Sequence, residues 1–272
     1  MLELLLVAIA LIGSLACGIY DLKTSNVPDK LVITMIVSAL SIHAITGYYA
    51  GDFTVLIDSF LYGGLFLAFG LLMYFTGQWG GGDGELLVAM GIMLPTLSFV
   101  NTYFPFAISF FINSFFIGAA YSIIYSMVLV FKNPKIGKKF FYNMKDKKII
   151  IALAASLSLS VAFLLIWQLI LFSISFLSFI MIFFHKYSKT IEESFYMKIP
   201  VSKLKVDDML GEDIPGLKLY KRYIKGLTEK QVKLIKKNRR YVVVREGIRY
   251  GIVFPLTLLF TLLFGDFFLL FI

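Results

Sequence analysis

The chain has 272 residues, of which 59% are hydrophobic, 17% aromatic and only 16% charged. A soluble domain of this length cannot bury so much apolar surface, so the composition predicts a polytopic membrane protein. The one cysteine excludes an intrachain disulfide, and with only two histidines no Cys/His cluster suggests a metal site. We therefore expect neither a metal nor another cofactor.

The positive charges predict how the chain is oriented in the membrane. Of the 26 lysines and arginines, two are Lys23 and Lys30, seven lie within residues 132–148, and seventeen lie within residues 186–249. Because lysine and arginine mark the cytoplasmic side of a membrane protein, all three regions are expected inside the cell. The N-terminus is then outside, and the protein is expected in the cytoplasmic membrane.

Five apolar runs predict a membrane core over residues 1–131. The expected helices cover about residues 2–19, 31–48, 55–76, 85–101 and 106–131. The first run could pass for a signal peptide, but Glu3 stands where a basic region is typical, so we expect a retained helix. In this topology the first helix ends inside at Asp21, and the third returns inside to a loop, Gly80–Gly84.

The second half of the chain alternates between basic and apolar segments. Residues 132–148 are expected to form a basic cytoplasmic loop, residues 185–251 a basic cytoplasmic segment, and residues 252–272 the last transmembrane helix. The uncharged stretch 149–184 would be about 54 Å long as one helix, far beyond a ~30 Å hydrocarbon core. We expect a hydrophobic hairpin of two short helices that turn near Trp167-Gln168, or one re-entrant hairpin.

The expected fold is an all-α polytopic membrane protein with about eight transmembrane helices, or six, and a small α+β insert before the last helix. In the insert, Thr228 and Gln231 have the spacing of a capping box that opens a helix through Lys237. Tyr241–Arg245 has the composition of a strand. The positive charge of the insert fits attraction to anionic lipid headgroups, or a role in gripping a substrate. It lacks the modules of nucleic-acid-binding proteins, so no nucleic acid partner is expected.

Two aspartates stand at the membrane boundary on the side predicted to be cytoplasmic. Ionisable groups beside membrane spans are functional candidates, and Asp83 is flanked by glycines that let a peptide backbone approach closely. Two carboxyl groups that share a proton can hydrolyse a peptide bond, because one activates a water and the other polarises the carbonyl. Asp21 and Asp83 are the candidates for this pair.

Each of these acids also has a structural interpretation. Asp21 could pair with Lys23 at the membrane interface, and Asp83 could be the N-cap of the helix that follows it. Glu85 favours the same helix start through the helix macrodipole, so we expect a structural role for it before a catalytic one.

With these residues identified, the chain resembles the archaeal preflagellin peptidases and type IV prepilin peptidases, the GxGD aspartyl proteases of membranes. Gly80-Gly81-Gly82-Asp83 matches the GxGD element. Asp21-Leu22-Lys23-Thr24, followed by Val27-Pro28-Asp29-Lys30-Leu31, is similar to the family's first-aspartate element. The segments Gly226-Leu227-Thr228 and Val244-Arg245-Glu246-Gly247-Ile248 are similar to archaeal members. The resemblance is good over residues 1–131 and at the C-terminus, and weak over residues 132–225.

The resemblance implies an aspartic endopeptidase in which Asp21 and Asp83 are catalytic and no cofactor takes part. The implied substrate is a prepilin or preflagellin with a short basic leader, which such enzymes cut at the cytoplasmic face of the membrane. The substrate backbone is expected to add to an exposed strand near the glycines of the loop. The residues expected to contact substrate are Gly80, Gly81, Gly82, Gly84 and Glu85, with Asp207 and Asp208 as further acids for the basic leader.

Two other functions stay open. Tyr20-Asp21 and Pro255-Leu256-Thr257-Leu258 are faintly similar to motifs of presenilin-like intramembrane proteases, although the aspartates of those enzymes lie mid-span in later helices. A small transporter whose acids relay protons is the alternative from another class, but such proteins often show two similar halves, and none is visible here. The sequence leaves open the natural substrate class and the oligomeric state.

Overall fold

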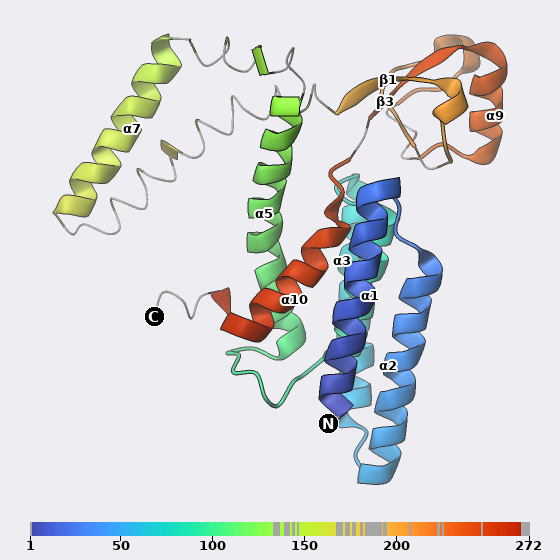
Figure 1. The fold of residues 1–272 in the computed structure, drawn as a ribbon, viewed down its shortest axis with the longest axis vertical. Coiled ribbons are helices and arrows are strands. Elements are labelled where there is room, and N and C mark those ends of the chain that lie inside the picture. The colour runs from blue at the N-terminus through green and yellow to red at the C-terminus, as the bar shows by residue number, and fades with distance from the viewer. Residues whose placement is uncertain are drawn as a thin grey trace. The chain divides into compact units, whose positions relative to one another are not determined.

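A computed structural model gives the fold of the protein (Figure 1). It describes residues 2–132, 137–138, 142, 145, 147–166, 171, 175, 178–179, 182, 192, 195–206, 208–221, 224, 226–245 and 247–267. The chain forms two compact units. Unit 1 combines Met1–Ile123 with Gly247–Ile272, and unit 2 is Ile124–Glu246.

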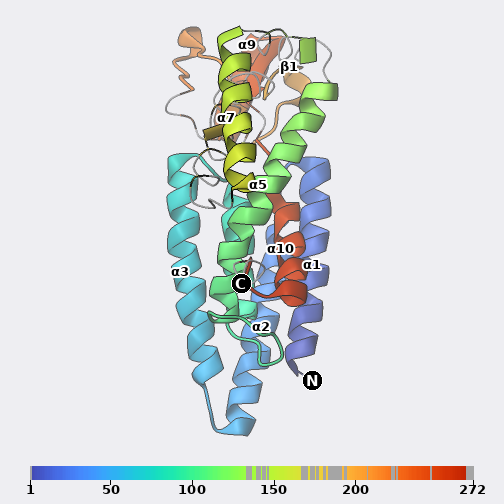
Figure 2. The same ribbon diagram turned by 90° about the vertical axis from the view of Figure 1, so that its left-hand side faces the viewer.

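Unit 1 is a helical bundle. Its elements are α1 (Leu2–Thr24), α2 (Asp29–Ala50), α3 (Thr54–Thr76), α4 (Gly81–Met93), the first part of α5 (Phe106–Lys132), the 3₁₀ turn η3 (Tyr250–Ile252) and α10 (Val253–Phe264). Short connections make α1, α2 and α3 run antiparallel, so α1 and α3 end at the same end of the bundle (Figures 1 and 2). That end carries both candidate aspartates.

Among the residues that the structure describes, four helices are long and apolar enough to cross a membrane, namely α1, α2, α3 and α5. Large apolar side chains on them are exposed, among them Ile12, Ile57 and Phe75, as expected of surfaces that face lipid. The structure therefore supports a multi-pass membrane protein. The predicted count of about eight spans is not confirmed within the described residues.

The fourth helix differs from the prediction of about residues 85–101. α4 begins earlier, at Gly81, and ends at Met93. It ends there because Leu94 precedes Pro95, and a proline ring disfavours helical angles at the residue before it. The φ and ψ angles of Leu94 are −130° and 60°, outside the helical region. With 13 residues, α4 is about 20 Å long, shorter than a ~30 Å hydrocarbon core.

α4 packs tightly against α3 in the centre of unit 1. A Cβ atom placed on Gly70 of α3 would lie only 3.0 Å from the Cα of Gly84 in α4. Leu86, Leu87 and Met90 are almost wholly inaccessible to solvent. Small residues that let two helix backbones approach are typical of packing between membrane helices, and here they fix the position of the turn that carries Asp83.

Unit 2 contains a small antiparallel sheet. Its strands are β1 (Tyr196–Pro200), β2 (Met209–Leu210) and β3 (Tyr241–Arg245), in the order β1-β3-β2. The predicted strand Tyr241–Arg245 is thus confirmed as the central strand. The helix α9 (Glu229–Asn238) begins at the predicted capping box, in which the Thr228 N–H donates to Gln231 Oε1 at 2.8 Å.

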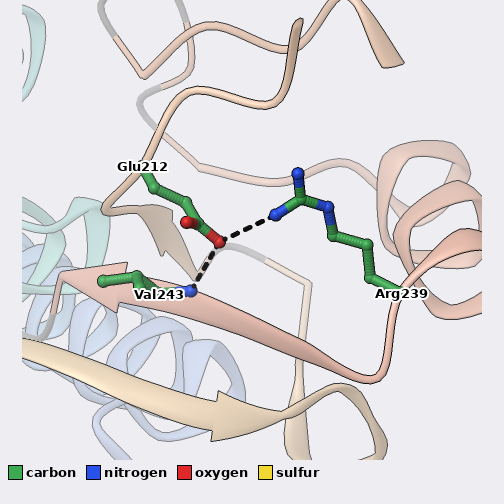
Figure 3. Close-up of polar contacts among 3 residues, drawn as sticks. All are labelled: Glu212, Arg239 and Val243. Carbon is green, nitrogen blue, oxygen red and sulfur yellow. Dashed lines mark hydrogen bonds and ion pairs between the residues drawn. The ribbon is translucent and has the colours of Figure 1, made fainter. Parts of the chain in front are cut away.

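A carboxylate links two parts of unit 2. Glu212 Oε1 accepts from the backbone N–H of Val243 in β3 at 3.1 Å and from Arg239 Nη1 at 3.2 Å (Figure 3). Arg239 directly follows α9. Glu212 therefore connects the end of α9 to the central strand, while buried apolar residues such as Leu227 and Ile235 form the core between them.

The predicted hydrophobic hairpin is described in part. Its first limb is the helix α7 (Lys147–Leu165). The hydroxyl of Ser160 in α7 donates to the Ser175 hydroxyl at 3.1 Å, so residue 175 lies beside α7. The turn predicted near Trp167-Gln168 lies outside the described residues.

Candidate active site

Asp21 is buried in the last turns of α1, with an exposed fraction of 6%. The helix was expected to stop near residue 19 but continues to Thr24, so Asp21 is a helical residue rather than the first residue of a loop. Its Oδ2 accepts from the backbone N–H of Gly251 in η3 at 3.0 Å. A Cβ on Gly251 would lie 3.1 Å from the Asp21 Cβ, a contact tighter than most, so the glycine favours this close approach.

Arg249 places a positive charge near Asp21. One guanidinium nitrogen, Nη1, donates to the backbone carbonyl of Leu22, and the charge of Arg249 acts on the Asp21 carboxyl group. The Tyr121 hydroxyl of α5 donates to the backbone carbonyl of Arg249 at 2.9 Å. The structural alternative for Asp21 was a pairing with Lys23, whereas the groups found to act on its carboxyl group are the Arg249 guanidinium and the Gly251 N–H.

Asp83 is the third residue of α4 rather than part of a loop. Its Oδ2 accepts from the backbone N–H of Gly80 at 3.2 Å. An acidic side chain at the third helical position that accepts from the N-cap N–H is half of a capping box. The N-cap is therefore Gly80, and the alternative in which Asp83 is the N-cap is wrong. Burial, and then the negative charge of Asp21, raise the pKa of Asp83 to about 7.

Aromatic side chains connect the two aspartate environments. The ring centroids of Trp79, just before α4, and Tyr250 of η3 are 5.4 Å apart. The Tyr250 hydroxyl donates to the backbone carbonyl of Ser114 in α5 at 3.1 Å, and the charge of Asp83 acts on it. Tyr250 thus adjoins Asp83, while the next residue, Gly251, binds Asp21.

The four glycines around Asp83 have different surroundings. A Cβ on Gly82 would lie 2.6 Å from the Val27 Cβ, and one on Gly84 would lie 3.3 Å from the Gly70 Cα. A Cβ on Gly81 would meet only Tyr74, at 3.9 Å. Gly82 and Gly84 therefore make close contacts within the protein itself, closest at Gly82. The predicted contact of these glycines with substrate stays a prediction.

Glu85 lies in α4 beyond its first turn, with an exposed side chain. The first-turn acid of this helix is Asp83, so the predicted role of Glu85 at the helix start is wrong. Partial burial and the charge of Asp29 raise the pKa of Glu85. Glu85 is therefore an exposed acid next to the candidate pair.

The two further acids named for the basic leader belong to unit 2. Asp207 lies outside the described residues, and Asp208 accepts from the Lys205 N–H within unit 2.

Three site residues, Arg249, Tyr250 and Gly251, were missed by the sequence reasoning. They lie immediately before the last apolar run, and a basic residue beside a membrane span was the one available signal. In the part of the chain that the structure describes, no group of three or more His, Cys, Asp or Glu side chains gathers that could hold a metal. The described site is thus a pair of carboxyl groups with one guanidinium and backbone N–H donors.

Comparison with known proteins gives a match around this site. Residues 8–123 match the type IV leader peptidase family, a range that includes both aspartates. The chain is 31% identical over 144 residues to a preflagellin peptidase of Methanococcus voltae, an alignment that covers 48% of this chain and 59% of the relative.

Two further preflagellin peptidases are similar to the chain. That of Methanocaldococcus jannaschii is 31% identical over 86 residues, covering 31% of this chain and 36% of the relative. That of Methanococcus maripaludis is 27% identical over 161 residues, covering 51% and 67%. The alignments thus span from about a third to two thirds of these relatives. The resemblance predicted from the sequence is confirmed: residues 8–123 are similar to the type IV leader peptidase family and to preflagellin peptidases.

Proposed function

We propose that the protein is a membrane-embedded aspartyl endopeptidase that removes the leader peptides of preflagellin-like or type IV prepilin-like precursors. The main support is the fold of unit 1: α1 ends and α4 begins at the same end of the bundle, so Asp21 and Asp83 both lie there, and the charge of Asp21 adds to the burial that raises the pKa of Asp83. The similarity to preflagellin peptidases supports the same reaction class.

In this reaction one carboxylate removes a proton from a water, which attacks the scissile carbonyl carbon. The other carboxyl group donates its proton to the carbonyl oxygen. Two carboxyl groups that interact electrostatically keep one proton between them over a range of pH. The raised pKa of Asp83 favours such a singly protonated pair near neutral pH.

We further propose that the site opens to the cytoplasm. The support is the distribution of positive charge: Lys23 and Lys30 lie beside the α1–α2 connection, at the same end of unit 1 as both aspartates. A precursor would then keep its basic leader in the cytoplasm and its apolar segment in lipid. Glu85 is exposed and lies in α4, four residues after Gly81, where the helix begins. It is the proposed contact for a positively charged residue of the leader.

The test is cleavage of a preflagellin and of a prepilin by the purified protein in detergent. Asp21→Asn and Asp83→Asn should each reduce kcat by at least about a thousandfold, since removing one member of a catalytic unit disables it. Asp52→Asn is the matched control, because Asp52 is exposed in the α2–α3 connection. Retained cleavage in either site variant rejects the pair as catalytic.

Glu85→Ala should raise KM for a basic leader and leave kcat unchanged.

A further inference from the structure

We propose that the segment Arg249-Tyr250-Gly251 is a positioning element that keeps Asp21 as the carboxylate, which makes Asp21 the general base and Asp83 the general acid. This assignment rests on the proposed function, and it distinguishes two carboxyl groups that the peptidase mechanism alone leaves interchangeable. It comes from the different groups that surround each aspartate.

Gly251 supplies the first difference. Its buried N–H donates to Asp21 Oδ2 at 3.0 Å, and a hydrogen bond from a fixed donor stabilises the charged form of an acceptor. Glycine favours this approach, since a Cβ there would lie 3.1 Å from both Cβ and Oδ2 of Asp21 and would press on the carboxyl group. Gly18 of α1 packs on the same segment, with its Cβ position 2.8 Å from the Ile252 Cα. Backbone packing therefore holds the donor in place.

Arg249 supplies the second difference, a positive charge. Its guanidinium group is held by the Leu22 carbonyl, and its own carbonyl is held by the Tyr121 hydroxyl. The charged groups that act on Asp21 thus include a guanidinium, whereas burial and then the negative charge of Asp21 raise the pKa of Asp83. A shared proton is consequently more stable on Asp83.

Tyr250 connects the two sides of the site. Its ring lies 5.4 Å from that of Trp79, which precedes the turn that carries Asp83, and its hydroxyl binds the Ser114 carbonyl at 3.1 Å. Gly118 leaves the space for this hydroxyl, because a Cβ there would overlap it. The same three-residue segment therefore contacts α1, α5 and the start of α4.

The chemical step balances with water as the only co-reactant. Water forms the new C–O bond and gives a proton to Asp21, while the Asp83 proton moves to the carbonyl oxygen and a tetrahedral diol results. As the C–N bond breaks, the Asp21 proton passes to the leaving amine and a diol proton returns to Asp83. Both aspartates end in their starting protonation states.

The first test compares Arg249→Gln with Arg249→Lys by the pH dependence of kcat/KM. The acidic limb reports ionisation of the base. In Arg249→Gln this limb should move to higher pH by about one unit, because an opposite charge nearby typically lowers a carboxyl pKa by one unit or more. Arg249→Lys, which keeps the charge, should retain most of the wild-type position. An acidic limb that stays in place in Arg249→Gln overturns the proposal, whatever the rate.

The second test uses two glycines of the same connection. Gly251→Ala should lower kcat at least about tenfold, since misplacing a catalytic group by a fraction of an ångström has effects of this size. Gly247→Ala makes the same chemical change where a Cβ meets nothing within 4 Å, and it should behave as wild type. A wild-type kcat in Gly251→Ala overturns the positioning role.

The third test does not require activity. Aspartate labelled with ¹³C at the carboxyl carbon is titrated by NMR in detergent micelles, and Asp21→Asn and Asp83→Asn assign the two signals. Near pH 6, Asp21 should report a carboxylate and Asp83 a carboxylic acid; the reverse order overturns the assignment. If wild type cleaves no precursor but this order is found, the proposed function fails and the charge assignment stands.

Discussion

Asp83 shows how the surroundings of one carboxyl group set its proton affinity. Asp21 of α1 and Tyr250 of η3 are ionisable groups that face it; the charge of Asp21 raises its pKa, and the Gly80 N–H partly offsets this rise. Burial is the largest contribution to its raised pKa. An aspartate that keeps its proton near neutral pH can serve as a general acid without any metal.

The pH dependence follows from the sign of this shift. A pKa raised to about 7 means that Asp83 is protonated below that pH and ionised above it. We expect kcat/KM for a preflagellin peptide to fall about tenfold for each pH unit above about 7, as for loss of one essential proton. Equal activity at pH 6 and pH 9, at constant ionic strength, would contradict the acid role of Asp83.

Gly82 allows a steric prediction beside the catalytic group. A Cβ on Gly82 would lie 2.6 Å from the Val27 Cβ, whereas one on Gly81 has room. Gly82→Ala should therefore destabilise the protein by about 1–3 kcal/mol through overpacking. Gly81→Ala should be neutral or stabilise it by about 0.5–1 kcal/mol through helix propensity. Thermal unfolding in detergent measures both, and equal stability of the two variants would count against the close contact.

At the scale of elements, the packing of α3 on α4 decides where Asp83 lies. Gly-Gly-Asp-Gly is a poor helix former, yet these residues begin α4. The adjoining apolar turns of α4, with Leu86, Leu87 and Met90, are buried against the bundle. Burial of this apolar surface offsets the low propensity, since most helical stability in proteins comes from packing.

The prediction at this scale uses two glycines of α3. A Cβ on Gly70 would lie 3.0 Å from the backbone of Gly84, while one on Gly64 meets nothing within 4 Å. Gly70→Ala should lower stability by about 1–3 kcal/mol and reduce kcat by displacing the start of α4. Gly64→Ala should leave both unchanged. The readouts are thermal unfolding and precursor cleavage; wild-type values for Gly70→Ala would contradict the close helix contact.

At the scale of the whole molecule, the predicted topology places the α2–α3 connection outside the cell and the segment before α7 inside it. Cys17 is the one cysteine and is fully buried, so an introduced cysteine gives a clear signal. In intact cells, a membrane-impermeant thiol reagent should label Asp52→Cys and should label Lys147→Cys only after the membrane is opened. Labelling of both from one side would overturn the predicted topology.

The sequence by itself determined the long helices and the local signals. α3 and α5 match the predictions within one residue, because a chain in hydrocarbon must satisfy its backbone hydrogen bonds within each segment. The capping box at Thr228 and the strand Tyr241–Arg245 were also confirmed. Such features depend on residues that are neighbours in sequence, so they are visible without the fold. The two aspartates were identified in the same way, by motif and charge.

Tertiary structure alone decided the surroundings of the aspartates. The hydrogen bond from Gly251 to Asp21 joins residues 230 positions apart, and no local pattern encodes such a contact. Packing likewise made Gly81–Gly84 helical and placed Asp83, rather than Glu85, in the first turn of α4. A motif identifies which groups are present, but their charges depend on burial and on neighbours brought together by the fold.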